Sequence, residues 1–177
     1  MSGHNKWSQI KNKKAASDAK KSQQFAMLVR NVALEARRTD GNRQAPGLRA
    51  AIEQARTANM PNENIDRAIE KALGTNGENY EEVIYETYGP GGVAMIIGGL
   101  TGNKNRTGQE IKHLLSDFGL TLAAPGAVTW AFVSRDGRWQ AKTETEITPA
   151  EHEELNRITV ALEAHPDVKK IYDNCRR

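Results

Sequence analysis

The sequence predicts an α+β protein in which a three-helix bundle precedes a ferredoxin-like βαββαβ domain with an extra strand at its start. Apolar residues recur at helical spacing up to about residue 74 and at strand-like spacing beyond about residue 80, with Thr75-Asn76-Gly77 as a linker. Residues 1–74 hold 14 Lys and Arg against 7 Asp and Glu, a net +7, whereas residues 75–177 hold 11 against 15, a net −4. We therefore expect two domains, at residues 1–76 and 77–177.

The first domain contains three predicted helices, each identified by an apolar stripe. One covers about residues 16–38 and ends at the break Asp40-Gly41-Asn42. A second covers about residues 46–58. It stops before Pro61, because proline disfavours the helical conformation in the residue before it. A third ends at Gly74, a residue suited to the end of a helix. The stripes consist of Phe25, Leu28, Val29, Val32 and Ala36; Leu48, Ala51, Ile52 and Ala55; and Ile65, Ala68, Ile69, Ala72 and Leu73.

The second domain alternates strands with helices. Its predicted strands lie at residues 83–88, 93–97, 127–133, about 139–147 and 167–173, with turns at Gly89-Pro90-Gly91-Gly92 and at Asp136-Gly137. A helix with Ile111, Leu114, Leu115 and Phe118 on one face has Thr107 and Glu110 as its predicted capping box and Gly119 as its end. A second helix opens at Thr148-Pro149-Ala150-Glu151 and buries Leu155, Ile158 and Leu162.

Composition excludes several classes of protein. Apolar residues make up 38% and charged residues 27%, which is typical of a soluble globular chain. No apolar run approaches the ~18 residues of a membrane span and no apolar segment follows the first lysines, so we expect a cytoplasmic protein. The single cysteine, Cys175, excludes an internal disulfide. The four histidines have no metal-ligand spacing, and we expect neither a metal nor a cofactor.

The opening stretch MSGHNKWSQIKNKKAASDAKK carries six lysines and one tryptophan against a single acid, Asp18. Lysines in this density would contact phosphates, and Trp7 would stack on a base or wedge against a groove. The alternative is a solvated arm whose Trp7 packs on the bundle. The loop at residues 101–107 opens a helix, where free N–H groups favour an anion, although a plain capped turn explains it equally well. The candidate nucleic-acid-binding residues are Lys6, Trp7, Lys11, Lys13, Lys14, Lys20, Lys21, Arg30, Lys104 and Arg106.

Catalytic patterns are not evident. The sequence contains no Walker or dinucleotide fingerprint, no HExxH motif, and no nucleophile triad in a believable context. Some ferredoxin-like proteins hydrolyse phosphates with an arginine and an asparagine, so Asn105 and Arg106 keep this alternative open. We expect a non-enzymatic protein.

Several motifs, taken together and in order, resemble the YebC/PmpR family, which includes the mitochondrial translational activator of cytochrome c oxidase. The opening stretch is similar to the family pattern GHSKWxxIKxxKAxxDAK, with Asn5 in place of the usual serine. The similarity continues over nearly the whole chain, at residues 48–52, 58–61, 64–69, 85–92, 103–107, 161–163, 167–168 and 171–174.

The resemblance implies a helical first domain that carries the nucleic-acid contacts and a ferredoxin-like second domain. It also implies that this chain is a shortened form, because typical members carry a third domain inserted near residues 138–140. Family members are described either as translation factors that act on the ribosome, notably at stalling sequences, or as DNA-binding transcriptional regulators.

The choice between RNA and DNA rests on the type of basic residue. A DNA reader usually offers several base-reading side chains on one helix and two-fold symmetry. Here the charges are mostly lysines spread along an arm, which favours recognition of backbone and shape, and no dimer seam is visible. We therefore expect a monomer that binds ribosomal RNA or the ribosome as a translational activator or stall-relieving factor. A regulator of transcription that binds duplex DNA is the alternative.

Overall fold

The protein is described by a computed structural model that covers residues 3–74, 79–135 and 138–176; for residues 3–17, 19 and 20 it describes the backbone alone. The chain divides into two compact units, Met1–Asn79 and Tyr80–Arg177. The predicted linker at residues 75–77 and the predicted turn at Asp136-Gly137 lie outside the described residues. The mixed α+β class is confirmed, because three helices precede an antiparallel sheet with further helices.

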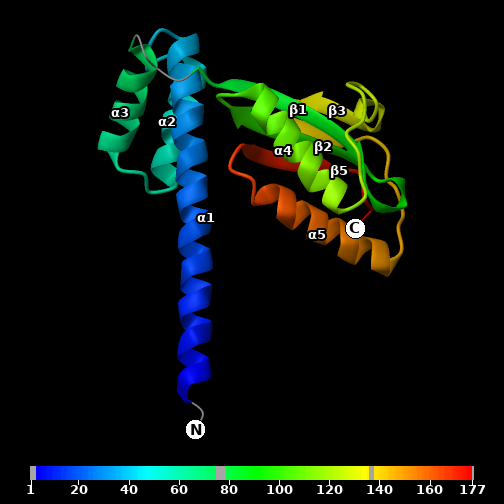
Figure 1. Cartoon of the computed structure of the whole chain (residues 1–177). Coiled ribbons are helices and arrows are strands. Elements are labelled where there is room, and N and C mark those ends of the chain that lie inside the picture. The colour runs from blue at the N-terminus through cyan, green and yellow to red at the C-terminus, as the bar shows by residue number, and fades with distance from the viewer. Residues whose placement is uncertain (1–2, 75–78, 136–137, 177) are drawn as a thin grey trace. The chain divides into compact units, whose positions relative to one another are not determined.

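The first unit is built on one long helix, α1 (Gly3–Arg38), against which α2 (Pro46–Thr57) and α3 (Asn62–Leu73) pack. Figure 1 shows both shorter helices beside the carboxy-terminal part of α1. Val32 and Ala36 are fully buried in this part of α1. Arg37 donates from Nε to the carbonyl oxygen of Ala72 at 2.7 Å, which ties the ends of α1 and α3 together.

The prediction that the first helix begins near residue 16 was wrong. The helix begins at Gly3, so the lysine-rich opening stretch is part of α1. Lysine, alanine and glutamine are all good helix formers, and no proline interrupts them. The apolar stripe that predicted this helix begins at Phe25, so periodicity did not identify the turns that precede it.

The predicted break after α1 is confirmed. Asp40 and Gly41 adopt positive φ angles of 49° and 74°, which reverse the chain before α2. A Cβ at Gly41 would lie 2.7 Å from the Leu73 side chain. Leu73 was expected in the core, but it is 46% exposed because it lies over this turn. The other predicted stripe residues of α2 and α3 are buried.

The second unit contains a three-stranded antiparallel sheet in the order β1-β2-β5. Its strands are β1 (Glu81–Tyr88), β2 (Ala94–Thr101) and β5 (Val168–Asp173). Helices α4 (Lys104–Asp117) and α5 (Pro149–Glu163) cover one face, where Met95 and Ile97 pack with Ile111, Leu115, Leu155 and Ile158 (Figure 1). The other face packs through Ile96 against Phe132 and Val128.

The two middle strands differ from the prediction. β3 (Phe132–Arg135) and β4 (Arg138–Ala141) are shorter than expected and form their own two-stranded sheet instead of joining the main one. The buried side chain of Glu86 accepts the N–H groups of Gly126 at 2.6 Å and Val128 at 2.8 Å, both in the segment before β3. These bonds hold the segment before Phe132 in turns, ending in the short 3-10 helix Thr129–Ala131.

The two long helices of this unit test the capping predictions. α5 has the predicted capping box between Thr148 and Glu151, with Pro149 at its first position. The capping box expected at Thr107 for α4 was wrong, because Asn103 is the cap and its side chain accepts the N–H of Arg106 at 3.1 Å. Gly119 follows α4 with a φ of +71°, as predicted.

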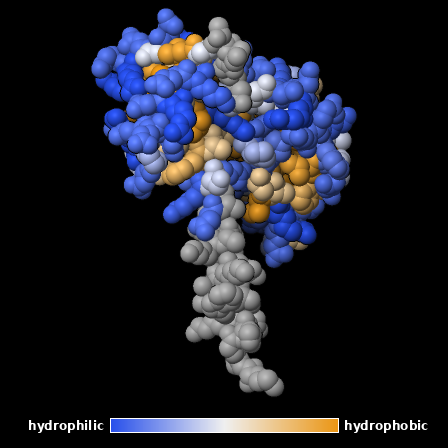
Figure 2. Space-filling model, turned by 60° about the vertical axis from the view of Figure 1, so that its left-hand side comes forward, coloured by the Kyte–Doolittle hydropathy of each residue, from blue (hydrophilic) through white to orange (hydrophobic). Residues whose placement is uncertain are grey.

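The described surface visible in Figure 2 is mostly hydrophilic, and its hydrophobic areas are small. Among the residues whose side chains are described, the large apolar ones with the greatest exposure are Val160, Trp130, Ile84 and Leu73. Among the described residues, none of the helices has the length and apolar content needed to cross a membrane.

Candidate nucleic-acid interface

Seven of the ten predicted site residues lie between positions 6 and 21 of α1. Positions 6, 13 and 20 recur every seven residues, as do positions 7, 14 and 21, so each set follows one line along the helix. Apart from Lys21, the side chains at these positions lie outside the described residues, as does that of Lys11. What the structure adds is the backbone: the lysines are carried on a continuous helix of 36 residues.

Lys21 and Arg30 are the predicted residues of α1 whose side chains are described. Lys21 is exposed and Arg30 is half-buried. They are nine residues apart, which at 3.6 residues per turn places them on opposite sides of α1. Lys21 therefore belongs with the lysine positions that precede it, whereas Arg30 belongs with the part of α1 that supports α2 and α3.

Lys104 and Arg106 lie in the second unit, at the start of α4. Lys104 is exposed, and its carbonyl oxygen accepts the hydroxyl of Tyr85 at 3.3 Å. Arg106 donates from Nη2 to Asp167 Oδ2 at 2.9 Å, and its Nε lies 3.7 Å from Glu110 Oε2. The hydrogen bond and the charge of Asp167 raise the pKa of Arg106. Arg106 thus has an internal partner, a role that the sequence did not indicate.

Asp167 is the centre of a buried polar network and is 1% exposed. Its Oδ2 atom accepts hydrogen bonds from Thr107 Oγ1 at 2.6 Å and Thr101 Oγ1 at 3.1 Å, in addition to the bond from Arg106. These contacts join β2, the start of α4 and the turn before β5. The sequence analysis did not predict this network. Its hydrogen bonds show that the polar residues of the loop at 101–107 have a structural role.

Glu110, His165 and Asp167 offer ligand atoms within 4.8 Å of one another, a spacing that would allow a cation to bind. The Nδ1 atom of His165 accepts the N–H of Asp167 at 3.1 Å, which leaves Nε2 as the donor to Glu110 Oε2 at 2.9 Å. Both ring nitrogens therefore have partners within the protein. The donor set fits a hydrogen-bonded network better than a metal site.

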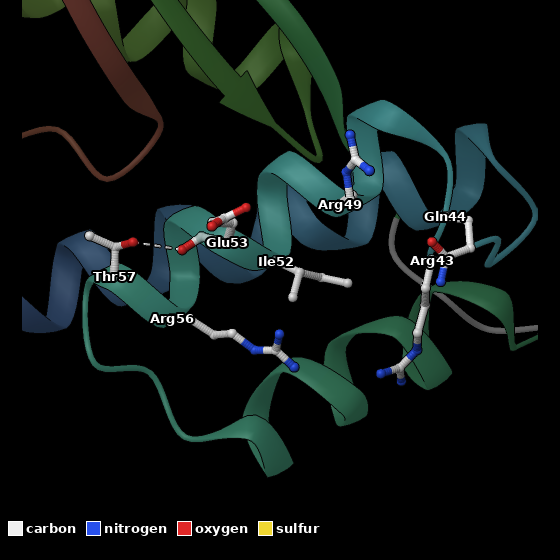
Figure 3. Close-up of a pocket in the computed structure, with 7 residues that line it drawn as sticks. All are labelled: Arg43, Gln44, Arg49, Ile52, Glu53, Arg56 and Thr57. Carbon is white, nitrogen blue, oxygen red and sulfur yellow. Dashed lines mark hydrogen bonds between the residues drawn. The ribbon is translucent and has the colours of Figure 1, made fainter.

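A pocket of about 430 Å³ on the first unit is lined by three arginines that the sequence analysis did not single out. Arg49 and Arg56 are two turns apart on the same side of α2, and Arg43 lies in the turn that precedes this helix. Figure 3 shows Ile52 between Arg56 and Arg43, with Arg49 and Glu53 on the opposite side of Ile52. The seven-residue spacing of Arg49 and Arg56 within the predicted helix was a signal that could have identified this face.

The three arginines differ in how they are held. Arg43 pairs through Nη2 with Asp66 Oδ1 on α3 at 2.7 Å. Arg56 donates from Nε to Asn62 Oδ1 at 3.0 Å, which leaves its two terminal nitrogens available. Arg49 is exposed, and its side chain has no hydrogen-bond or ion-pair partner among the described residues. The pocket therefore combines two oriented guanidinium groups with a third that is free to meet a ligand.

The first unit is also the basic one. Residues 1–79 contain 14 Lys and Arg against 8 Asp and Glu, whereas residues 80–177 contain 11 against 14. Electrostatic attraction for polyanions is thus concentrated on the helical unit. Fold and charge together define a class: two-unit α+β proteins with a basic helical unit and an acidic unit of sheet and helices.

Comparison with known proteins shows the family to which the chain belongs. Residues 5–75 match the model for the TACO1/YebC protein N-terminal domain, and residues 80–138 match the model for the TACO1/YebC second and third domain. The chain therefore belongs to the TACO1/YebC family.

Two relatives carry the name "probable transcriptional regulatory protein". One, from Thermotoga maritima, is 54% identical over 134 residues, which cover 75% of this chain and 53% of the relative. The other, from Fervidobacterium nodosum, is 47% identical over 162 residues, which cover 90% of this chain and 62% of the relative. The chain thus spans about half to three-fifths of the length of these curated relatives.

A solved structure, the crystal structure of a conserved hypothetical protein from Aquifex aeolicus, has the same fold. It is 28% identical, with a TM-score of 0.81, and the similarity covers 90% of this chain and 91% of that one.

Proposed function

We propose that this chain is a non-enzymatic regulator of gene expression that binds ribosomal RNA through its first unit, as a ribosome-associated translation factor of the activating or stall-relieving type. One observation carries the proposal: six lysines within the first 21 residues lie on one continuous helix whose unit has an excess of positive charge. Each lysine that contacts a phosphate releases a counterion, so such a helix binds nucleic acid in a salt-dependent way.

Ribosomal RNA fits this arrangement better than duplex DNA. Lysine is a point charge on a flexible stem, so it contacts phosphates without reading base edges. A protein that recognises structured RNA relies on phosphates, 2′-hydroxyls and shape in this way. A DNA reader would instead need several base-reading side chains on a helix placed in the major groove.

Regulation of transcription through duplex DNA is the second candidate, and the names of the relatives favour it. Phosphohydrolase activity has less support. Its candidate Arg106 is engaged with Asp167 and Glu110, and this arrangement leaves the guanidinium poorly placed to stabilise a transferred phosphoryl group.

The test is a comparison of affinities for two probes with equal numbers of phosphates, a structured ribosomal RNA fragment and a duplex DNA, measured by fluorescence anisotropy at several salt concentrations. We expect tighter binding to RNA and a loss of affinity when Lys13 and Lys14 are both changed to Ala. The slope of log K against log salt should fall by roughly 1.5 to 2, since two phosphate contacts are lost.

The matched control is Lys169→Ala with Lys170→Ala, which removes the same charge from exposed adjacent lysines of the second unit. This pair should leave RNA affinity nearly unchanged. Equal losses from the two pairs would contradict the assignment to the first unit. Tighter and sequence-dependent binding to the duplex would favour the transcriptional regulator.

A further inference from the structure

The pocket on α2 combines chemical groups that a site for simple anions would not need. Its floor includes the apolar side chain of Ile52, which is 7% exposed. Its rim carries three guanidinium groups from Arg43, Arg49 and Arg56, together with the carboxylate of Glu53. A bare phosphate would use the guanidinium groups, gain nothing from the apolar floor and be repelled by the carboxylate.

A nucleotide matches all three kinds of group. Its phosphate would bond to guanidinium forks, which suit phosphate geometry. Its flat base would lie on Ile52 and against a guanidinium plane, because unpaired bases in RNA stack on arginine as well as on aromatic rings. Its exocyclic amine or 2′-hydroxyl would donate to Glu53. The volume, about 430 Å³, is within the range of pockets that hold small ligands.

The arginines are arranged for such a ligand. The contacts of Arg43 with Asp66 and of Arg56 with Asn62 fix these two side chains with Ile52 between them, and they leave other N–H groups of each without a partner among the described residues. The side chain of Arg49 points in a different direction from these two in Figure 3, and it has no partner among the described residues. Two groups held in place cost little entropy on binding, and the third can close on the ligand.

From this geometry we infer that the α2 pocket binds one unpaired nucleotide of an RNA, such as a base in a loop or bulge. The inference rests on the proposed RNA-binding function and deepens it. The lysines of α1 supply affinity for any phosphate backbone, whereas the pocket selects RNA that presents an unstacked base. Fully paired RNA would engage α1 alone.

The test uses the full chain and two fluorescent RNAs with equal numbers of phosphates, a hairpin with an unpaired loop and a fully paired duplex. Arg49→Ala should weaken binding of the hairpin about tenfold, the effect of losing charge-assisted hydrogen bonds. Its effect on binding of the duplex should be no larger than that of the control variant, Arg67→Ala. Arg49 is exposed on α2 and alanine is the better helix former, so the variant should fold.

The control is Arg67→Ala, which removes the same charge from an exposed position on α3 outside the pocket. Arg49→Lys provides a second test, because it keeps the charge but removes the planar fork. It should remain nearly as weak as Arg49→Ala on the hairpin.

Three results would overturn the inference. In the first, Arg49→Ala and Arg67→Ala affect the hairpin equally; in the second, Arg49→Lys restores full affinity. Either leaves the proposed RNA-binding function intact and shows that Arg49 contributes charge alone. In the third, the unmodified chain binds neither RNA, which overturns the proposed function as well.

Discussion

At the scale of single residues, two buried carboxylates determine much of the second unit. Asp167 joins β2, α4 and the turn before β5 through Thr101, Thr107 and Arg106. Glu86 holds the segment that precedes β3 through the N–H groups of Gly126 and Val128. A buried carboxyl group is costly unless it is hydrogen-bonded, and each of these two has several donors.

We predict that Asp167→Asn lowers the free energy of unfolding by roughly 3 kcal/mol, because a buried charge-assisted network is replaced by weaker and partly mismatched bonds. Urea denaturation followed by circular dichroism would measure it. Asp117→Asn is the control, since Asp117 is exposed at the end of α4 and should tolerate the change. If the two variants were equally stable, the network would not hold the unit together.

Glu151 gives a prediction for pH dependence. Hydrogen bonds from the backbone and then the side chain of Thr148 lower the pKa of this carboxylate below its ordinary value. A lowered folded pKa adds stability above the unfolded pKa of about 4.3, and this stability is lost as the pH falls through the folded value. The difference in melting temperature between the unmodified chain and Glu151→Gln should therefore be present at neutral pH and shrink in acid.

The control for Glu151 is Glu153→Gln, an exposed glutamate of the same helix. Its melting temperature should follow that of the unmodified chain across the same pH range. A difference for Glu151→Gln that is constant from neutral to acidic pH would refute the role of the charged capping box.

At the scale of elements, prediction succeeded where a local pattern was sufficient. The capping box of α5 is contained in four consecutive residues, and the apolar stripe of α2 in two turns. Prediction failed where contacts between residues distant in the sequence determine the local structure. Glu86 accepts the N–H of Val128, a group within the strand expected at residues 127–133, and no local sequence pattern predicts this contact. Likewise, Asn103 caps α4 in place of Thr107, whose hydroxyl is bonded to Asp167.

The candidate site was predictable in part for the same reason. The density of lysines in the opening stretch is visible in the sequence, and so is its likeness to a family. The pocket on α2 was missed because it depends on the turn that brings Arg43 beside Ile52 and on partners supplied by α3. The spacing of Arg49 and Arg56 predicts that they share one side of a helix, but it does not predict which residues lie next to them.

Two adjacent leucines of α4 differ in burial, so their substitution compares the cost of losing a core side chain with that of losing a half-buried one. Leu115 is fully buried against the sheet, whereas Leu114 is only partly buried. Leu115→Ala should lower the free energy of unfolding by about 2–5 kcal/mol, since it removes contacts and leaves a cavity. Leu114→Ala should cost clearly less, as measured by chemical denaturation of both variants. Equal losses would mean that α4 is rotated relative to the sheet.

At the scale of the whole molecule, the two units have opposite charge. The basic unit carries α1 and the arginine pocket, and the acidic unit contains a packed apolar core and the hydrogen-bonded network around Asp167. Since the second unit repels polyanions on balance, its Lys104 is a weaker candidate for nucleic-acid contact than the lysines of α1. The account therefore assigns binding to the first unit.

Co-sedimentation with purified ribosomes tests this central claim most directly. The unmodified chain, Lys13→Ala with Lys14→Ala, and Lys169→Ala with Lys170→Ala would be compared, each with and without an excess of promoter-length duplex DNA. The account predicts that the unmodified chain and the second pair pellet with ribosomes despite the duplex, whereas the first pair stays in the supernatant. Failure of the unmodified chain to pellet, together with tight sequence-dependent binding to the duplex, would contradict the account and identify a regulator of transcription.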